Sequence, residues 1–449
     1  MAMTTVADRH LAAGLTARVA ALLDEHRDPV ALPELIVAFL KADMGDGRAA
    51  APRAATARPG RIGCVAKLLT SMTMLSLVDD GLLGLDTQAA DVVTCPVLAR
   101  HLRVGRISIR HLLSQSTALD DEAALNGQSR AGSGTLLERL ALAPYLYTPG
   151  RLFSNERAGS IIAGHLIAEI AGKPILQSLT ERVLDPLGAV LHVEERNGIV
   201  PAAYAEQSDG FDACGSDRLL MSADDLLRVI ASLLKGLPGD RAILSDGLRE
   251  EVLRCQAPAI PDTFITGFGL GLYLYQNGLA GISGAVGAEN CHIGLNASRG
   301  AALAFQSRGA SPTAFSWGGI YSDLLLLVAG DLPYRDMETE PVSGAAAAGV
   351  VGTYRRSRSA LSIHATGRAD APLRLEAQFG EGSYLHGGGG GTQLIEADLV
   401  PVGPSRYIID SAKSSAPAGT TKFAELSFHS GEGSAELVAA GGVVFSRIA

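Results

Sequence analysis

The sequence predicts an α+β domain followed by a smaller domain of antiparallel strands. Residues 65–78 are nearly all apolar or small hydroxyl residues, which makes this segment too apolar for a surface helix and too short to span a bilayer. From residue 267 the pattern alternates as in a strand, in runs at 267–276, 289–298 and 299–309. Past residue 331, short alternating segments follow one another between Gly-rich turns. These observations predict a helix buried through the first domain, its sheet, and an all-β second domain.

The composition limits the classes of function. The 449 residues, 47% of them hydrophobic, can form one large core and a smaller one. A formal charge of −9 argues against nucleic acid as a principal partner, because neutralising phosphates requires a basic face. With neither a signal-peptide pattern nor a run of about 18 apolar residues, we expect a cytoplasmic protein with no membrane partner. No cofactor or metal is expected, because the cysteines are scattered without metal-type spacing: Cys64, Cys95, Cys214, Cys255 and Cys291.

The segment before residue 62 predicts two elements. Residues 11–26 have the spacing of an amphipathic helix, and residues 35–39 fit a strand of a central sheet. Residues 41–61 are rich in Ala, Arg and Gly and have little strand character. We therefore expect a sheet that is trimmed at this point.

The start of the buried helix carries the chemistry. Cys64 follows Gly63 at the first turn, and Lys67 comes three residues later, so the two side chains lie on the same face. The positive end of the helix dipole and a nearby ammonium both favour the thiolate. This arrangement is typical of a nucleophile.

The same stretch resembles a known family. Ser-x-x-Lys opens a buried helix in the serine β-lactamase and penicillin-binding-protein family, and here the serine is replaced by Cys64. Further matches hold the register: LVDDGLLGLD at 77–86, ISIRHLLSQSTAL at 107–119, the Pro-Gly of 149–150 and the Ser-Ala-Asp-Asp-Leu of 222–226. We interpret His111 as structural, and Ser222 as a helix N-cap with Asp225 at the third position.

The resemblance implies an α/β sandwich with an all-helical subdomain, as in β-lactamases and transpeptidases, plus a small lipocalin-like antiparallel β-barrel at the C-terminus. It sets the catalytic domain at 1–335, with its helical part at about 62–260, a Gly/Ala-rich linker at 336–350 and the barrel at 351–449. Two family motifs are altered. Asn155, Glu156 and Arg157 stand where Tyr-Ser-Asn is expected, and Ile282, Ser283 and Gly284 stand where His-x-Gly is expected.

In the resembled family the serine attacks, the lysine helps deprotonate it, the tyrosine shuttles protons, and two backbone N–H groups bind the oxyanion. Carried over, Cys64 and Lys67 match their positions, while Asn155 could hold a carbonyl or an acceptor but cannot shuttle protons. Arg157 could bind a ligand carboxylate or phosphate, or pair with a nearby acid. Ser283 and Gly284 are predicted to contact substrate, and the candidates for an acceptor base are Glu156, Glu289 and His292. Since side chains alternate along a strand, Glu289 and His292 lie on opposite faces.

A cysteine nucleophile favours one class of reaction. A thiol exchanges acyl groups with thioesters at little thermodynamic cost, whereas releasing an ester or β-lactam acyl group to water is harder. The resemblance also includes acyltransferases. We therefore expect an acyltransferase whose donor is an acyl carrier protein or acyl-CoA thioester, with a small-molecule amine or hydroxyl as acceptor, in secondary metabolism. The alternatives are a thiol esterase or hydrolase of the same fold, and a non-catalytic binding or scaffold protein.

Overall fold

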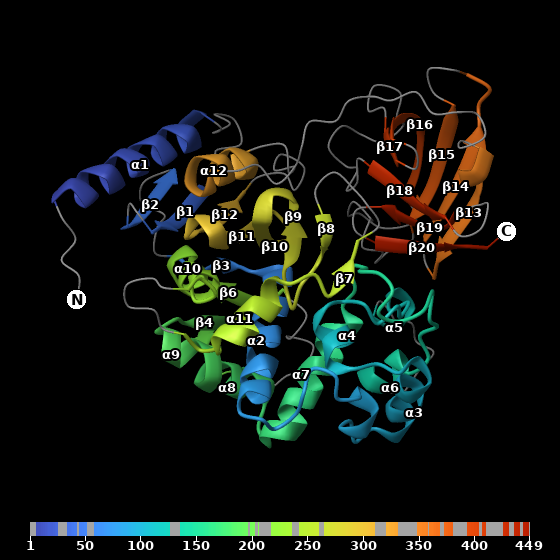
Figure 1. Cartoon of the computed structure of the whole chain (residues 1–449), viewed down its shortest axis with the longest axis horizontal. Coiled ribbons are helices and arrows are strands. Elements are labelled where there is room, and N and C mark those ends of the chain that lie inside the picture. Colours follow the sequence, from blue (N-terminus) through green and yellow to red (C-terminus); the bar gives the residue numbers. More distant parts are fainter. Residues whose placement is uncertain are drawn as a thin grey trace. The chain divides into compact units, whose positions relative to one another are not determined.

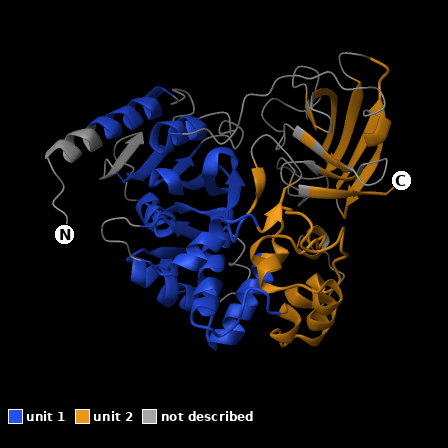
Figure 2. Cartoon of the chain, in the orientation of Figure 1, with its two compact units in different colours: residues 1–87, 160–255, 269–333 blue, residues 88–159, 256–268, 334–449 orange. Residues whose placement is uncertain are grey.

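The computed structural model describes residues 6–25, 34–42, 45–51, 58–125, 135–195, 198–202, 205, 217–235, 242–259, 265–309, 320–330, 348–357, 359–368, 372–379, 393–403, 406–409, 425–430, 435–440 and 443–448. The chain divides into two compact units (Figure 2): residues 1–87, 160–255 and 269–333 form the first, and residues 88–159, 256–268 and 334–449 the second. The predicted linker, apart from 348–350, and Cys214 lie outside the described residues.

The first unit is built around an antiparallel sheet in the order β2-β1-β12-β11-β10-β9. Helices α1 and α12 cover one face, while α10 and a small second sheet, β3-β6-β4-β5, lie on the other (Figure 1). The strands are β1 (Glu34–Lys41), β2 (Gly45–Ala51), β3 (Gly60–Arg61), β4 (Leu191–Glu195), β5 (Gly198–Pro201), β6 (Leu219–Met221), β9 (Tyr273–Tyr275), β10 (Leu279–Val286), β11 (Glu289–Asn296) and β12 (Ala301–Arg308).

The helices of this unit are α1 (Val6–Glu25), α2 (Ala66–Asp79), α8 (Ile175–Leu179), α9 (Asp185–Leu187), α10 (Ala223–Ala231), α11 (Asp246–Leu253) and α12 (Ile320–Ala329). Helix α2 confirms the predicted buried helix, since every residue from 66 to 77 is buried. It ends in a Schellman motif: Gly81 has φ 73°, its N–H bonds to the Val78 carbonyl, and the Leu82 N–H bonds to the Leu77 carbonyl. The predicted cap of α10 is also confirmed, because the Ser222 hydroxyl accepts from the Asp225 N–H.

The trimmed edge was predicted wrongly. Strand β2 (Gly45–Ala51) falls within the Ala/Arg/Gly-rich stretch and pairs with the full length of β1, from Leu35 opposite Ala51 to Lys41 opposite Gly45. Its small residues have weak strand propensity. Pairing with a regular neighbouring strand decides the conformation instead, because strand propensity depends on context.

The second unit joins short helices to a closed barrel. Its helices are α3 (Pro96–Gly105), α4 (Ile109–Leu113), α5 (Glu122–Leu125) and α6 (Leu136–Leu140), and α7 (Ala158–Ala171) begins here and continues into the first unit. Its strands are β7 (Ala257–Pro258), β8 (Ile265–Phe268), β13 (Gly352–Arg356), β14 (Ser359–Ala365), β15 (Leu373–Phe379), β16 (Gln393–Gly403), β17 (Arg406–Ile409), β18 (Glu425–Ser430), β19 (Ala435–Ala440) and β20 (Val443–Arg447). Strands β13 to β20 close when β13 pairs with β20, which confirms the predicted barrel.

The barrel interior is packed with apolar side chains. Phe428 meets both Tyr354 and Tyr407 edge to face, each pair with ring centroids 5.7 Å apart, among aliphatic residues from neighbouring strands. His111, predicted to be structural, completes a capping box with Ser108 at the start of α4. Among the described residues, no helix is long and apolar enough to cross a bilayer, and no group of three His, Cys, Asp or Glu side chains could hold a metal ion.

Candidate active site

Cys64 lies on a short turn that leads directly into α2. Residues Gly63–Val65 form a 3-10 turn rather than the first α-helical turn that we expected, and α2 starts at Ala66. Gly63 has φ 48°, a left-handed conformation that glycine adopts without strain. The Cys64 thiol is half-buried, and Lys67 on the first turn of α2 is only 1% exposed. A lysine side chain buried to this degree needs a polar partner, and Lys67 has at least one interaction of this kind.

The segment before Cys64 is held between two sheets. On one side, Arg61 pairs with Leu220 of β6, and the Ile62 N–H bonds to the Leu219 carbonyl at 3.0 Å. On the other side, the Glu289 carboxylate of β11 accepts a hydrogen bond from the Arg61 N–H at 3.0 Å and lies 3.4 Å from Nε of Arg308. Glu289, a predicted base, is therefore engaged by two arginines and anchors the turn that carries Cys64.

Strand β10 approaches this turn closely. A Cβ atom on Gly284 would overlap the Ile62 carbonyl oxygen and lie 2.8 Å from the Cys64 nitrogen, and one on Gly63 would lie 2.9 Å from the Ala285 nitrogen. Both positions require glycine, because only a backbone without Cβ allows this contact. The Cys64 amide nitrogen thus lies against Gly284 and the Ala285 amide nitrogen against Gly63, so that two backbone amides border this contact, as they do in an oxyanion hole. Ala285 was not identified from the sequence, although it directly follows the altered triplet.

Ser283 and His292 point to the face of the sheet that α12 covers, opposite to the face on which Gly284 meets the Cys64 turn. They are register partners, and the Ser283 hydroxyl lies 2.8 Å from Nδ1 of His292. The His292 ring stacks on Tyr321 of α12, with centroids 4.7 Å apart. Burial lowers the pKa of His292 to about 4, so the ring is neutral at physiological pH. The structure thus places Gly284 beside Cys64 but turns Ser283 and His292 toward α12.

The residues at the second altered motif lie in the other unit. Asn155 and Arg157 are half-buried and Glu156 is fully buried, all on the loop that leads into α7. The Glu156 carboxylate accepts from the Thr117 N–H at 3.1 Å and from its hydroxyl at 2.7 Å. Burial and the charge of Asp121 raise the pKa of Glu156 to about 8, so this side chain holds a proton at neutral pH.

The segment that faces this loop is strained. Gln115 (φ 49°) and Ala118 (φ 60°) adopt the left-handed conformation, which costs a non-glycine residue about 1 kcal/mol. Gln115 accepts the Ser154 N–H with its backbone carbonyl and the Glu156 N–H with its side chain, on either side of Asn155. Strain of this kind is retained where the surrounding contacts fix the backbone, which happens often at functional sites.

Three comparisons extend these observations. The Beta-lactamase family model matches residues 37–328. Penicillin-binding protein 4 of Amycolatopsis lactamdurans is 25% identical over 330 residues, which cover 66% of this chain and 84% of that protein. Among solved structures, SurE with D-Leu is 20% identical, with a TM-score of 0.71, covering 98% of this chain and 100% of that one. The D-amino acid amidase from Ochrobactrum anthropi SV3, complexed with L-phenylalanine amide, is 19% identical, with a TM-score of 0.51, covering 66% of this chain and 91% of that one.

Proposed function

Because the chain belongs to the β-lactamase family, whose model matches residues 37–328, we propose that it moves acyl groups through a covalent intermediate on Cys64. The observation that carries this proposal is the glycine contact between β10 and the turn before α2, which the amide nitrogens of Cys64 and Ala285 border. Two backbone N–H groups at the nucleophile suit the oxyanion that forms when an acyl carbonyl is attacked.

The reaction follows from these groups. The thiolate of Cys64 attacks the carbonyl carbon of a thioester donor, and the negative charge moves to the oxygen beside the two N–H groups. The bond to the donor sulfur then breaks, and the donor leaves as a thiol with the proton that Lys67 receives from Cys64. An acceptor amine or hydroxyl next attacks the acyl-enzyme, gives up its proton and releases Cys64 as a thiol.

The proposed donor is a thioester of an acyl carrier protein or of coenzyme A, and the proposed acceptor is a small-molecule amine or hydroxyl. A reducing cytoplasm would keep Cys64 usable, and we propose that compartment. Hydrolysis is the second candidate, because an amidase shares the fold. Two relatives in the comparison are described with D-amino acids, D-Leu in SurE and the D-amino acids of the amidase. A D-aminoacyl thioester is therefore the first donor to test.

The test is intact mass spectrometry after incubation with the N-acetylcysteamine thioesters of D-Leu and of L-Leu. We expect an adduct on the wild-type protein and none on Cys64→Ala, with the Cys64→Ala melting temperature unchanged. Loss of the adduct on adding an amine supports transfer, and decay in buffer alone supports hydrolysis. If neither donor labels the wild-type protein, the acyl-enzyme proposal is wrong. If Cys64→Ala unfolds, Cys64 is a core residue.

A further inference from the structure

The loop that carries Asn155 is hydrogen-bonded to the barrel by a buried guanidinium and by a backbone amide. Arg356 is the last residue of β13, and its side chain has no exposed surface. Its Nη1 donates to the Ser154 hydroxyl at 3.2 Å, and its Nη2 donates to Oδ1 of Asp121 at 2.9 Å. Ser154 immediately precedes Asn155, and its hydroxyl also accepts the Val444 N–H of β20 at 3.2 Å.

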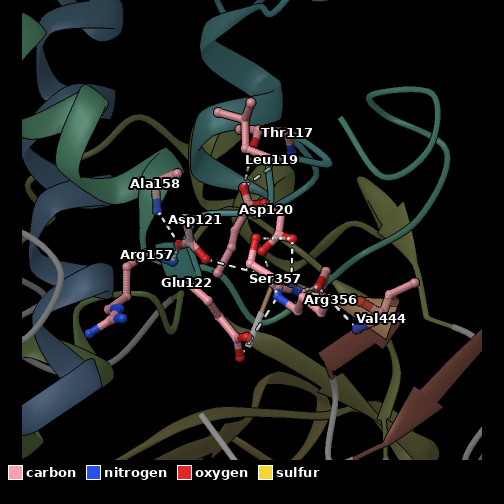
Figure 3. A network of polar contacts seen from close by, with 12 residues as sticks. Thr117, Leu119, Asp120, Asp121, Glu122, Arg157, Ala158, Arg356, Ser357 and Val444 are labelled. Atoms are coloured by element: carbon pink, nitrogen blue, oxygen red, sulfur yellow. Dashed lines mark hydrogen bonds and ion pairs between the residues drawn. The ribbon is translucent and has the colours of Figure 1, made fainter. Parts of the chain in front are cut away.

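Asp121 continues this connection to the other end of the loop. Its Oδ2 accepts hydrogen bonds from the Arg157 N–H at 2.6 Å and from the Ala158 N–H at 2.9 Å, where α7 begins. A carboxylate at that position satisfies two backbone donors and interacts favourably with the helix dipole. Figure 3 shows Asp121 between these amides and Arg356, while the Arg157 side chain points away from the network. One guanidinium therefore holds residues 155–157 from both sides.

The charges explain why an arginine stands here. Nε of Arg356 lies 3.5 Å from Asp120 and 3.9 Å from Glu122, and both carboxyls are at most 3% exposed. Asp120 also accepts from the N–H and the hydroxyl of Ser357. Buried carboxylates require a cation and several donors, and only the forked guanidinium can address Ser154 and Asp121 together. A lysine would supply the charge at a single point.

We propose that Arg356 is a positioning residue for acyl transfer, which fixes the backbone of residues 155–157 through Ser154 and Asp121. The inference rests on the proposed function, because Asn155 occupies a motif position of the family. It gives the C-terminal barrel a part in the reaction through a residue that lies outside the matched family region, 37–328.

The test compares Arg356→Met and Arg356→Lys with Arg368→Met, whose guanidinium pairs with Asp398 in the same barrel. We expect Arg356→Met to lower kcat for transfer to an amine about 100-fold, because a small misplacement of a site loop has effects of this size. Arg356→Lys should recover part of that loss. Alkylation of Cys64 by iodoacetamide should stay at the wild-type rate in all three variants, and Arg368→Met should transfer normally.

A double variant separates positioning from general destabilisation. If Arg356 acts through Asn155, Arg356→Met combined with Asn155→Ala should be no slower than Asn155→Ala alone. Multiplying effects, or a normal kcat in Arg356→Met, would overturn the inference. Should Arg356→Met fail to fold, Ser154→Ala replaces it in the same cycle, with the same two outcomes.

Hydrogen exchange keeps the test independent of the proposed function. Even if no donor labels wild-type Cys64, the amides of residues 155–158 should lose protection in Arg356→Met and keep it in Arg368→Met. Unchanged protection in Arg356→Met would show that this guanidinium does not hold the loop.

Discussion

At the residue scale, Lys67 and Glu156 are both buried ionisable side chains. Lys67 sits one turn after Cys64 on α2, whereas Glu156 is a fully buried carboxyl that carries a proton at neutral pH. The proximity of Cys64 and Lys67 along the chain could be predicted from the sequence because they are three residues apart, although Cys64 lies on the turn before α2 and Lys67 on its first turn. The contact between Arg356 and Asp121, which helps to hold residues 155–157, could not be predicted. The two residues are 235 positions apart, and no local pattern connects them.

Lys67→Ala should slow alkylation of Cys64 by iodoacetamide at pH 7 by about tenfold, because removing a nearby cation favours the unreactive thiol. The measurement is the pseudo-first-order rate followed by mass spectrometry. Lys235→Ala is the matched control, since Lys235 pairs with Glu250 at the surface. Equal rates in Lys67→Ala and wild type would remove Lys67 from the mechanism.

Glu156→Gln should change how stability depends on pH. The folded pKa of about 8 lies above the ordinary value of 4.5, so folding binds a proton between these values, and stability falls as pH rises through that window. One such proton lowers the free energy of unfolding by about 1.4 kcal/mol for each pH unit of increase. A neutral glutamine removes this dependence.

The measurement is the urea midpoint of wild type and variant from pH 5 to pH 8, with the exposed Glu250→Gln as control. If the urea midpoints of wild type and Glu156→Gln changed in parallel with pH, the Glu156 carboxyl would be ionised in the folded protein.

At the element scale, the contact between β10 and the turn Gly63–Val65 sets the geometry of the site. The helix was predicted because its apolar run has a single interpretation, and most barrel strands were predicted because they alternate. Strand β2 was not predicted, because its small residues do not alternate between apolar and polar. The contact at Gly284 could not be predicted either, because it depends on the distance between two backbone segments.

Gly284→Ala should lower the rate of Cys64 acylation by about 100-fold, since the added methyl group pushes β10 from the Ile62 carbonyl and disturbs the two amide donors. Gly247→Ala makes the same chemical change on α11, where a Cβ meets nothing within 4 Å, and should acylate normally. Rates measured with the thioester that labels wild type decide the outcome. Normal acylation in Gly284→Ala would contradict the proposed oxyanion hole.

At the scale of the whole molecule, the barrel and residues 88–159 belong to one compact unit. Hydrogen exchange in increasing urea should therefore show the barrel strands and α4 losing protection at the same denaturant concentration. Their linkage through Arg356 gives the physical reason, because separating them would leave several buried carboxyls without a cation. Separate transitions would show that the barrel folds independently. The sequence predicted that a barrel is present, but this linkage depends on long-range contacts.

The order of synthesis gives the buried network a further consequence. A ribosome completes residues 120–156 long before it makes residue 356, so the nascent acidic segment must wait for its guanidinium. Until β13 is made, Asp121 can accept hydrogen bonds from the start of α7, but neither Asp121 nor Ser154 has its hydrogen bond from Arg356. A strand translated about 200 residues later therefore completes a segment made much earlier, and products truncated before residue 356 should be substrates for chaperones and proteases.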